Sequence, residues 1–347
     1  MICANHELLE NQLSLEFYIS MQVLRSLLAP SEIAKVISNN YYIDNIVNYS
    51  LIKFGGSNDI YFIETNTEKY IGKLYSQRKC WPYISSHYLF EVNYHSFLEK
   101  KGILCPKPIR TSDNQLLLFI NTPEYQKYFC LYAYLDGRTL SEDELTPEIC
   151  FILGKHLANL HLAADQFKLT EPTHRYLNIK FLLEMPYQRL INFYNTTKFS
   201  EKIKQDTSDI YYLLKQEIEL IDLQQLMTSW IHGDLHLQNY FFLNNGNYAF
   251  LDFELSGHGY YIYDIATFYW KLAYSLEQSS SLKLFEYFVA GYQHINPTIK
   301  KDLSYLKTFA RLRHFFLLGS SAILYPDNPQ QLIPENFQNY LNKFNFF

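Results

Sequence analysis

Apolar residues recur along this chain at two spacings, and the change from one to the other separates its regions. Over residues 7–28 they fall three or four positions apart, which predicts a leading amphipathic helix. Three short segments follow that are rich in β-branched and aromatic side chains and divided by turn residues; they are 49–53, 59–65 and 69–75. This composition predicts three antiparallel strands. Helical spacing returns over 89–103, where Gly102 can end the helix.

Two more strands are expected at 115–120 and 128–135 before helices take over. A helix is predicted over 148–165, with Thr146 as its N-cap and Pro147 at its first position. The remaining expected elements are helices within 176–228, a small β-rich insert at 239–253, and helices from 263 to the end. We therefore predict an α+β fold with a strand-rich first lobe and a mainly helical second lobe.

Length and composition agree with two lobes and exclude some classes of protein. A chain of 347 residues is too long for one small core, and we place the boundary between residues 1–135 and 136–347. Hydrophobic residues make up 48% and charged residues 19%, as in globular proteins. The net charge of −5 leaves no basic excess to neutralise phosphates, so nucleic acid is not an expected partner.

Cysteine usage and hydropathy favour a cytoplasmic protein. The five cysteines are scattered and include no C-x-x-C pair, so neither a disulfide framework nor a zinc site is expected. The first residues lack the layout of a signal peptide. No apolar run approaches the roughly 20 residues that span a bilayer, so we expect no membrane association.

Polar residues gather in "IHGDLHLQNYFF" (231–242), beside a predicted hairpin. Asn245 and Gly246 are favoured in a two-residue type I′ turn, and counting outwards from them places Asn239 opposite Asp252. Opposed side chains have Cβ atoms roughly 4.5–5.5 Å apart. An amide and a carboxylate at that separation can share a hard cation such as Mg²⁺.

Asp234 precedes this pair by five residues, in the loop that leads into the first strand of the hairpin. A carboxylate there can accept a proton from a hydroxyl group while a metal holds a phosphate, which is the arrangement that phosphoryl transfer needs. The alternative is a helix-capping aspartate next to an ordinary hairpin end. The joint spacing of Asp234, Asn239 and Asp252 favours the catalytic interpretation.

The motifs "HGDLHLQN", "LDFE" and "YDIA" resemble those of the aminoglycoside phosphotransferase and choline kinase superfamily, the small-molecule relatives of protein kinases. The resemblance covers about residues 50–270 and implies a bilobal protein-kinase-like fold that uses ATP or GTP with Mg²⁺. It implies Asp234 as catalytic base and Asn239 and Asp252 as magnesium ligands. His232 is expected to brace the catalytic loop, and Asp264 to hold the same loop through backbone contacts.

The first lobe offers the other parts that such a fold requires. Lys73 lies on the third predicted strand, where a lysine pairs with phosphate oxygens, and Glu91 lies on the following helix, where a glutamate orients that lysine. The loop "FGGSND" can bring backbone amides close to phosphate, through Gly55, Gly56 and Ser57. The strand "CLYAYL" (130–135) is interpreted as the hinge that contacts the base; its candidate residues are Tyr132 and Tyr134.

The acceptor is expected to be a small molecule with a hydroxyl group, such as an amino alcohol, an aminoglycoside, homoserine or a sugar. Glu254, Tyr260 and Trp270 could form an acidic and aromatic site for a cationic acceptor. The alternative is that Glu254 supports the metal site and that the aromatic residues belong to the core. The basic segment "FARLRHFF" (309–316) could bind an acidic substrate group or form internal ion pairs, and the latter is favoured.

Two other functions are weighed against this one. A protein serine/threonine kinase of the same fold needs a long activation segment, and the short stretch between Asp252 and Asp264 has no room for it. A nucleotide-binding pseudokinase needs a broken set of catalytic residues, and the set is complete. His156 and His161, five residues apart on one helix, are assigned to packing.

Overall fold

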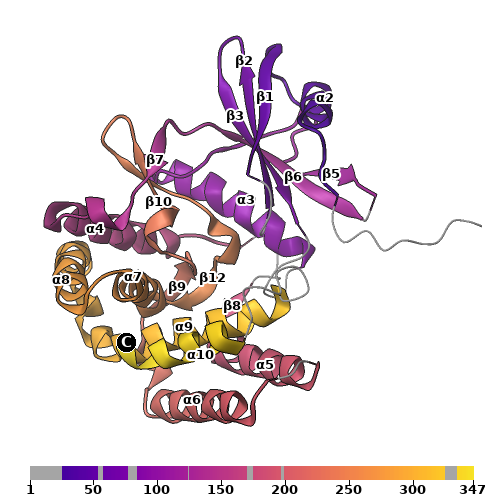
Figure 1. The fold of residues 1–347 in the computed structure, drawn as a ribbon. Coiled ribbons are helices and arrows are strands. Elements are labelled where there is room, and N and C mark those ends of the chain that lie inside the picture. Colours follow the sequence, from indigo (N-terminus) through magenta and orange to yellow (C-terminus); the bar gives the residue numbers. More distant parts are fainter. Residues whose placement is uncertain are drawn as a thin grey trace, which may run out of the picture.

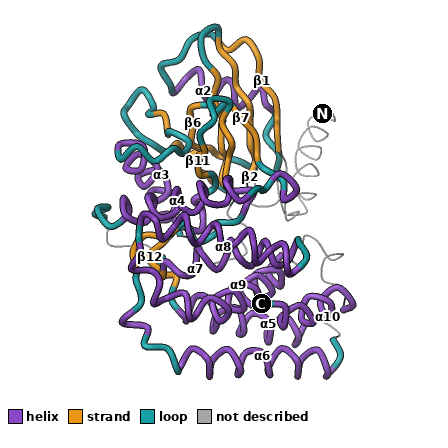
Figure 2. Tube along the Cα trace, turned by 90° about the vertical axis from the view of Figure 1, so that its left-hand side faces the viewer, coloured by secondary structure: helices purple, strands orange, loops and turns teal. Residues whose placement is uncertain are grey.

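The computed structural model describes residues 26–53, 58–76, 84–123, 125–169, 175–196, 199–324 and 334–347. Figure 1 shows a strand-rich lobe joined to a larger helical lobe, and Figure 2 shows the same division from the side. The predicted α+β, two-lobed fold is therefore confirmed. The predicted helix over 7–28 lies outside the described residues.

The first lobe is built on a mostly antiparallel meander. Its strands are β1 (Ile46–Lys53), β2 (Asn58–Thr65), β3 (Lys69–Tyr75), β4 (Pro108–Ile109), β5 (Leu118–Asn121) and β6 (Gln126–Ala133). They pair in the order β1-β2-β3-β6-β4, and β5 pairs with β6. All these pairings are antiparallel, as the sequence predicted for the first three strands.

Two helices accompany this sheet, α2 (Pro30–Asn40) and α3 (Ser85–Lys100). Because strand side chains alternate between faces, one face packs on α2 through Tyr61 and Ile63. The other face buries Tyr75 and Tyr132 with residues of α3. Helix α3 ends just before Gly102, whose φ of 75° is the left-handed conformation that glycine tolerates.

The second lobe is mainly helical. Its helices are α4 (Pro147–Ala164), α5 (Met185–Thr196), α6 (Glu201–Glu219), α7 (Tyr261–Ser275), α8 (Gln278–Ile295), α9 (Leu306–Leu324) and α10 (Pro334–Asn342). Shorter 3₁₀ turns are Glu142–Glu144, Leu223–Gln225, Leu237–Asn239, Phe253–Leu255, Pro297–Tyr305 and Lys343–Phe346, and a π-helical turn is Lys180–Glu184. The predicted cap of α4 is confirmed, since Thr146 accepts a hydrogen bond from the Ile149 N–H. Among the described helices, none has the length and apolarity needed to cross a bilayer.

Helices α4 and α8 touch backbone to backbone. A Cβ atom added at Gly154 of α4 would lie 1.9 Å from the carbonyl oxygen of Phe288. One added at Gly291 of α8 would lie 1.9 Å from the carbonyl oxygen of Phe151. Glycine is therefore required at both positions for the two helices to approach this closely.

Two three-stranded sheets lie between the sheet of the first lobe and the helices. One has the order β11-β10-β7 and the other β8-β12-β9. The strands are β7 (Gly137–Thr139), β8 (Tyr176–Leu177), β9 (Thr228–Ile231), β10 (Tyr240–Leu243), β11 (Tyr248–Phe250) and β12 (Gly257–Tyr260). Strand β7 follows β6 directly and pairs with β10, so the segment after β6 ties the two parts of the chain together.

The hairpin of β10 and β11 confirms the predicted strands but corrects their register. Tyr240 pairs with Phe250, and the Leu251 N–H donates to the Asn239 carbonyl, so Asn239 is opposite Leu251 and not Asp252. The connection has three residues rather than two, and Gly246 adopts φ of 85°. Asn-Gly sequences serve in either loop length, which is why the shift of one residue was not foreseen.

Candidate active site

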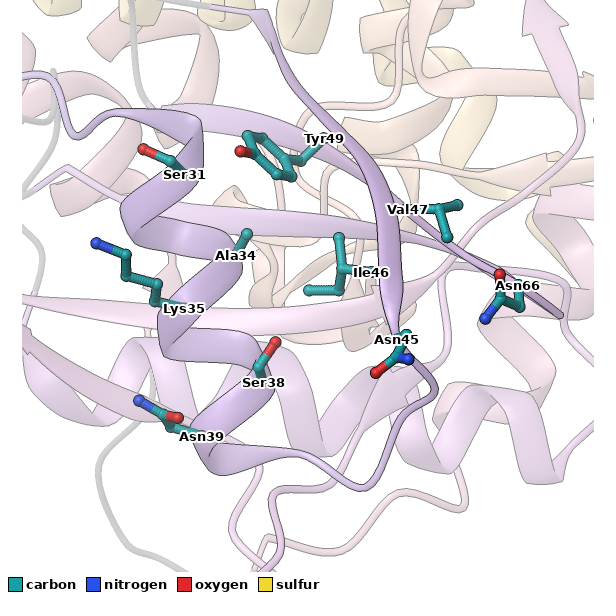
Figure 3. A pocket seen from close by; sticks show the side chains of 10 residues that line it. All are labelled: Ser31, Ala34, Lys35, Ser38, Asn39, Asn45, Ile46, Val47, Tyr49 and Asn66. Carbon is teal, nitrogen blue, oxygen red and sulfur yellow. The ribbon is translucent and has the colours of Figure 1, made fainter.

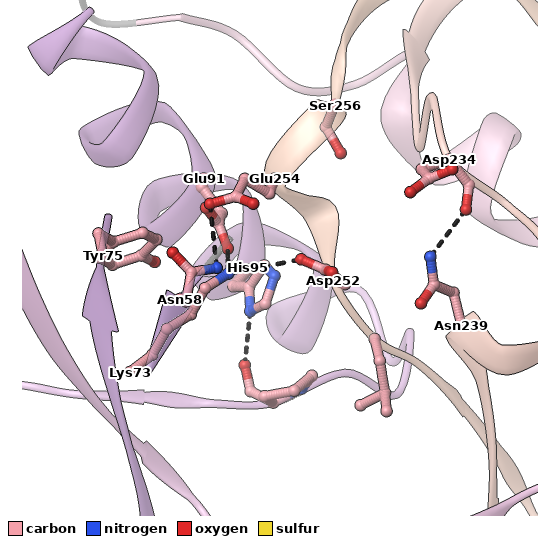
Figure 4. A network of polar contacts seen from close by, with 12 residues as sticks. Asn58, Lys73, Tyr75, Glu91, His95, Asp234, Asn239, Asp252, Glu254 and Ser256 are labelled. Carbon is pink, nitrogen blue, oxygen red and sulfur yellow. Dashed lines mark hydrogen bonds and ion pairs between the residues drawn. The ribbon is translucent and has the colours of Figure 1, made fainter. Parts of the chain in front are cut away.

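A cavity of about 560 Å³ opens between the two lobes and contains Lys73 of β3. The Lys73 Nζ lies 2.8 Å from Glu91 Oε1 of α3 and 3.5 Å from Asp252 Oδ1 (Figure 4). Burial disfavours the charge of Lys73, but Glu91, Asp252 and Glu254 outweigh that effect and raise its pKa. The structure therefore brings together the lysine and glutamate that the sequence singled out, and the lysine stays charged.

Asp252 follows β11, and its backbone is left-handed, with φ of 57°. This conformation is uncommon for a residue with a side chain and is found at functional sites. It turns the chain into the 3₁₀ segment Phe253–Leu255. Figure 4 shows the carboxylate between the Lys73–Glu91 pair and Asn239. The backbone conformation of Asp252, and not the predicted strand register, therefore directs this side chain into the cleft.

Asn239 ends the 3₁₀ turn before β10 and is buried. Its Nδ2 donates to the Asp234 carbonyl oxygen at 2.8 Å, which leaves the Oδ1 atom on the side of Asp252 (Figure 4). An amide oxygen and a carboxylate are hard ligands that suit Mg²⁺. Among the described residues, no three or more acidic, histidine or cysteine side chains are placed so that together they could hold a metal ion. Mg²⁺ fits nevertheless, because it is usually held by one or two carboxylates together with substrate phosphates.

Asp234 lies in the loop between β9 and β10, with its side chain 22% exposed. Its Oδ1 accepts a hydrogen bond from Arg313 Nη2 of α9, and its Oδ2 lies 3.9 Å from His236 Nε2. Burial lowers the pKa of His236, although Asp234 opposes that effect. One oxygen of the Asp234 carboxylate therefore contacts the Arg313 guanidinium, and the other lies near the largely buried His236 ring.

Asp264 of α7 accepts hydrogen bonds from the backbone of the loop that carries Asp234. The backbone N–H groups of His232 and Gly233 donate to the Asp264 carboxylate at 2.8 and 2.7 Å. His161 Nε2 of α4 approaches the same carboxylate at 3.1 Å. His232 Nε2 in turn lies 2.7 Å from the Leu251 carbonyl oxygen, one residue before Asp252. These bonds connect the loop of Asp234 to the chain next to Asp252.

The segment expected to contact a nucleotide base lines the same cavity. The N–H groups of Ala133 and Tyr134 donate to the carbonyls of Lys107 and Lys69 at 2.8 and 3.1 Å. The Tyr132 hydroxyl is 2.9 Å from the Tyr75 hydroxyl, within the core. Tyr132 and Tyr134 both line the cavity, but the Tyr132 hydroxyl and the Tyr134 N–H are used within the protein. Gly55, Gly56 and Ser57 lie outside the described residues.

The three residues suggested for a cationic acceptor contact different parts of the molecule. Glu254 is buried and its Oε1 accepts from Asn58 Nδ2 of β2 at 3.1 Å, on the side of Lys73 (Figure 4). The Tyr260 ring packs on Phe309 of α9. Trp270 donates through Nε1 to His314 Nδ1 at 3.0 Å. The structure thus does not gather these side chains into one wall.

Several residues of the cleft were not singled out from the sequence. Asn58 and His95 line the cavity, and burial lowers the pKa of His95 to about 3. Arg313 contacts Asp234 from 79 residues away. The favoured interpretation of the basic segment as a source of internal ion pairs agrees with this contact and with the Arg311–Glu217 pair at 2.8 Å. Its partner at Asp234 could not be read from the sequence, because α9 itself carries no motif.

A second hollow, of about 760 Å³, lies between α2 and β1 (Figure 3). Lys35 is the charged side chain among the residues that line it, and its Nζ already contacts Glu32 at 2.7 Å. The lining otherwise consists of small polar and apolar side chains such as Ser38 and Val47. Because converging acidic and basic groups are found in the interlobe cleft and not here, we place the active site in the cleft.

Comparison with known proteins identifies the family. The sequence matches the phosphotransferase enzyme family over residues 48–301. It is 27% identical to a homoserine kinase of Bartonella tribocorum, covering 90% of this chain and 93% of that protein. Among solved structures, the amicoumacin kinase hAmiN in complex with AMP-PNP and Ca²⁺ superposes with a TM-score of 0.73 at 17% identity, covering 91% of this chain and 92% of that one. A microcompartment-associated aminopropanol kinase superposes with a TM-score of 0.70 at 18% identity, covering 91% and 94%. The chain therefore belongs to the phosphotransferase enzyme family and is a kinase whose acceptor group is a hydroxyl.

Proposed function

We propose that this protein transfers the γ-phosphoryl group of ATP, in the presence of Mg²⁺, to a hydroxyl group of a small molecule. The observation that supports the proposal is the convergence of Asp234, Asn239 and Asp252 with the Lys73–Glu91 pair on one cleft. Phosphoryl transfer needs these parts and little covalent chemistry from the protein.

Asp234 orients the acceptor hydroxyl and takes its proton as the bond between the acceptor oxygen and the γ-phosphorus forms. The bond from that phosphorus to the β–γ bridging oxygen breaks, and ADP leaves with the electron pair. Asn239 and Asp252 would hold Mg²⁺, which supplies positive charge to the phosphate oxygens when it is bound. Lys73 adds a further positive charge, and Glu91 fixes its direction at 2.8 Å.

The base of the nucleotide is placed against the wall formed by Tyr134 and Leu135. The N–H groups of Ala133 and Tyr134 are already used within the protein. In our proposal the Leu135 N–H is therefore the donor to a ring nitrogen of the base. The substitution Leu135→Pro removes this N–H donor and is expected to weaken nucleotide binding.

The acceptor class proposed is a short hydroxylated compound that carries an amino or carboxylate group. The similarity to homoserine kinases and to an aminopropanol kinase supports this class. Amino alcohols and hydroxy amino acids are the compounds to test first, and aminoglycosides and sugars complete the panel.

The test is a measurement of ADP release by the purified full chain with Mg-ATP and a panel of these acceptors. We expect release that depends on one acceptor class and that stops when EDTA removes the metal. Asp209→Asn, at an exposed residue whose side chain contacts Gln205 of the same helix, is the matched control and should behave as wild type. In a parallel assay with γ-labelled ATP, transfer of the label to serine or threonine of a protein, with no active small acceptor, would contradict the proposal and indicate a protein kinase.

A further inference from the structure

Arg313 is an unusual neighbour for a catalytic base. Its residue is only 2% exposed, and its Nη2 donates to Asp234 Oδ1. A buried guanidinium is costly unless it is paired, so this contact stabilises both groups in the acceptor-free protein. The Asp234–Arg313 pair is electrically neutral as a unit.

The guanidinium is not filled by this contact. Arginine has five N–H donors, and Arg313 Nε makes no hydrogen bond to any described residue. Nη1 reaches the Gly233 carbonyl only at 3.5 Å. One further buried polar atom near Asp234, His236 Nδ1, also has no partner among the described residues. Burial raises the pKa of Tyr263 to about 12, while the charge of Arg313 and a hydrogen bond to it oppose that shift. Buried polar groups normally have partners, so the Arg313 Nε–H is a donor that a ligand can use.

The aromatic surface here is already used by a cation of the protein. The Arg313 guanidinium carbon lies 5.8 Å from the centre of the Trp270 ring and 5.9 Å from that of Phe316. An acceptor ammonium placed on Trp270 would meet this positive charge instead of an electron-rich ring that is free. The guanidinium next to the Trp270 ring therefore disfavours a cationic group there, and its unused Nε–H favours an anionic one.

From these contacts we infer that the acceptor carries a carboxylate close to its reacting hydroxyl and that Arg313 is the residue that binds it. A carboxylate matches the planar guanidinium and can form two parallel hydrogen bonds. The hydroxyl of the same short molecule then reaches Asp234, which contacts Nη2 of the same guanidinium. The acceptor class is thus a hydroxy acid or hydroxy amino acid. This inference rests on the proposed function.

Matched acceptors test the inference directly. Homoserine without its carboxylate is 3-amino-1-propanol, and serine without its carboxylate is ethanolamine. Binding to the full chain with Mg-AMP-PNP is measured by calorimetry, and kcat/KM is measured with Mg-ATP. We expect the carboxylated member of at least one pair to bind at least about 10-fold more tightly, as a charge-assisted hydrogen bond implies.

Substitutions identify the residue that reads the carboxylate. Arg313→Met should bring the ratio of kcat/KM within the pair close to one, and Arg313→Lys should restore part of it. The control is Arg311→Met on the same helix, since Arg311 pairs with Glu217 and not with Asp234. Arg311→Met should keep the wild-type ratio. A purely structural role of Arg313 would lower both members of the pair equally and leave their ratio unchanged, which would overturn the inference.

The inference and the proposed function fail in different ways. If acceptors without a carboxylate are phosphorylated at least as well as their partners, the proposed function stands and the inference is overturned. If carboxylated compounds bind through Arg313 but no hydroxyl is phosphorylated, the binding site is correct and the proposed function fails. Binding of neither member of either pair overturns the inference.

Discussion

The nucleotide side and the acceptor side of the cleft treat buried charge differently. On the nucleotide side, the single ammonium of Lys73 is surrounded by three carboxylates, those of Glu91, Asp252 and Glu254. On the acceptor side, one carboxylate and one guanidinium balance each other and leave donors unfilled. The first arrangement has an excess of negative charge that suits Mg²⁺, and the second suits a ligand that shares the guanidinium.

The largest expected effect separates the two aspartates. Asp234→Asn should lower kcat by about 10²–10⁴-fold, the usual contribution of a general base, with nucleotide affinity close to that of wild type. Asp252→Asn should instead weaken the Mg²⁺ dependence of nucleotide binding. Steady-state kinetics and calorimetry with and without Mg²⁺ measure both. Equal loss of nucleotide binding in the two variants would mean that the cleft is not divided in this way.

Removing the cation on each side should change stability unequally. Lys73→Met removes the ammonium group that pairs with Glu91, whose side chain is 2% exposed, and should cost about 3–5 kcal/mol of unfolding free energy. Arg313→Met should cost less, because Asp234 is 22% exposed and water can replace part of the lost contact. Urea unfolding measures both. The double variant Lys73→Met/Glu91→Gln should recover part of the loss, and no recovery would argue against a charge effect.

The pH dependence of stability reports on His314, the residue after Arg313, and on its contacts with Trp270 and Tyr340. Burial lowers the pKa of His314 to about 4, against an ordinary value of 6.5. Its Nδ1 accepts from Trp270, and its Nε2 lies 2.8 Å from the Tyr340 carbonyl oxygen, so the neutral ring is fully bonded. Between pH 6.5 and 4 the unfolded chain binds a proton that the folded protein does not.

Stability should therefore fall as the pH falls through that window, by up to about 1.4 kcal/mol per pH unit from this residue. Urea unfolding at several pH values gives the slope. His314→Gln removes the titrating group and should flatten it. A slope that His314→Gln leaves unchanged would show that other groups dominate acid unfolding.

The smallest expected effects come from two left-handed glycines, one after the helix of Glu91 and one in the hairpin after Asn239. Gly102 ends the helix that carries Glu91, and Gly246 turns the hairpin that follows Asn239; their φ values are 75° and 85°. A Cβ atom at either position would meet no atom within 4 Å, so only the backbone conformation opposes alanine. Gly102→Ala and Gly246→Ala should each lower the unfolding free energy by about 1–2 kcal/mol without changing kcat. Thermal unfolding and steady-state kinetics check this, and a loss of kcat in Gly246→Ala alone would show that the turn positions Asn239.

The nucleotide side could be predicted from sequence further than the acceptor side. The spacing of strands and helices brought out Lys73 and Glu91, and the structure places them in contact. The register of the hairpin was wrong by one residue because an Asn-Gly pair does not fix the loop length. Asp252 reaches the cleft through its backbone conformation, which no local pattern specifies.

The contacts that sequence reasoning missed, on both sides of the cleft, join distant segments. Arg313 lies 79 residues from Asp234, and Asn58 lies 196 residues from Glu254. A helix that carries Arg311 and Arg313 predicts ion pairs but not which arginine turns inward. The direction of Glu254 was equally open, because a side chain in a 3₁₀ turn can point to either lobe. Such choices are made by tertiary packing, and one sequence does not contain them in a readable form.

The backbone contact between α4 and α8 makes distant positions matter for catalysis. His161 of α4 meets Tyr292 of α8 at 2.7 Å, one residue from Gly291, and the same imidazole approaches Asp264 at 3.1 Å. A single methyl group at Gly154 or Gly291 would force the helices apart and shift the support of the loop that carries Asp234. Substitutions among relatives should therefore be more frequent at residues that contact the acceptor than at Gly154 and Gly291. Neither glycine touches a substrate.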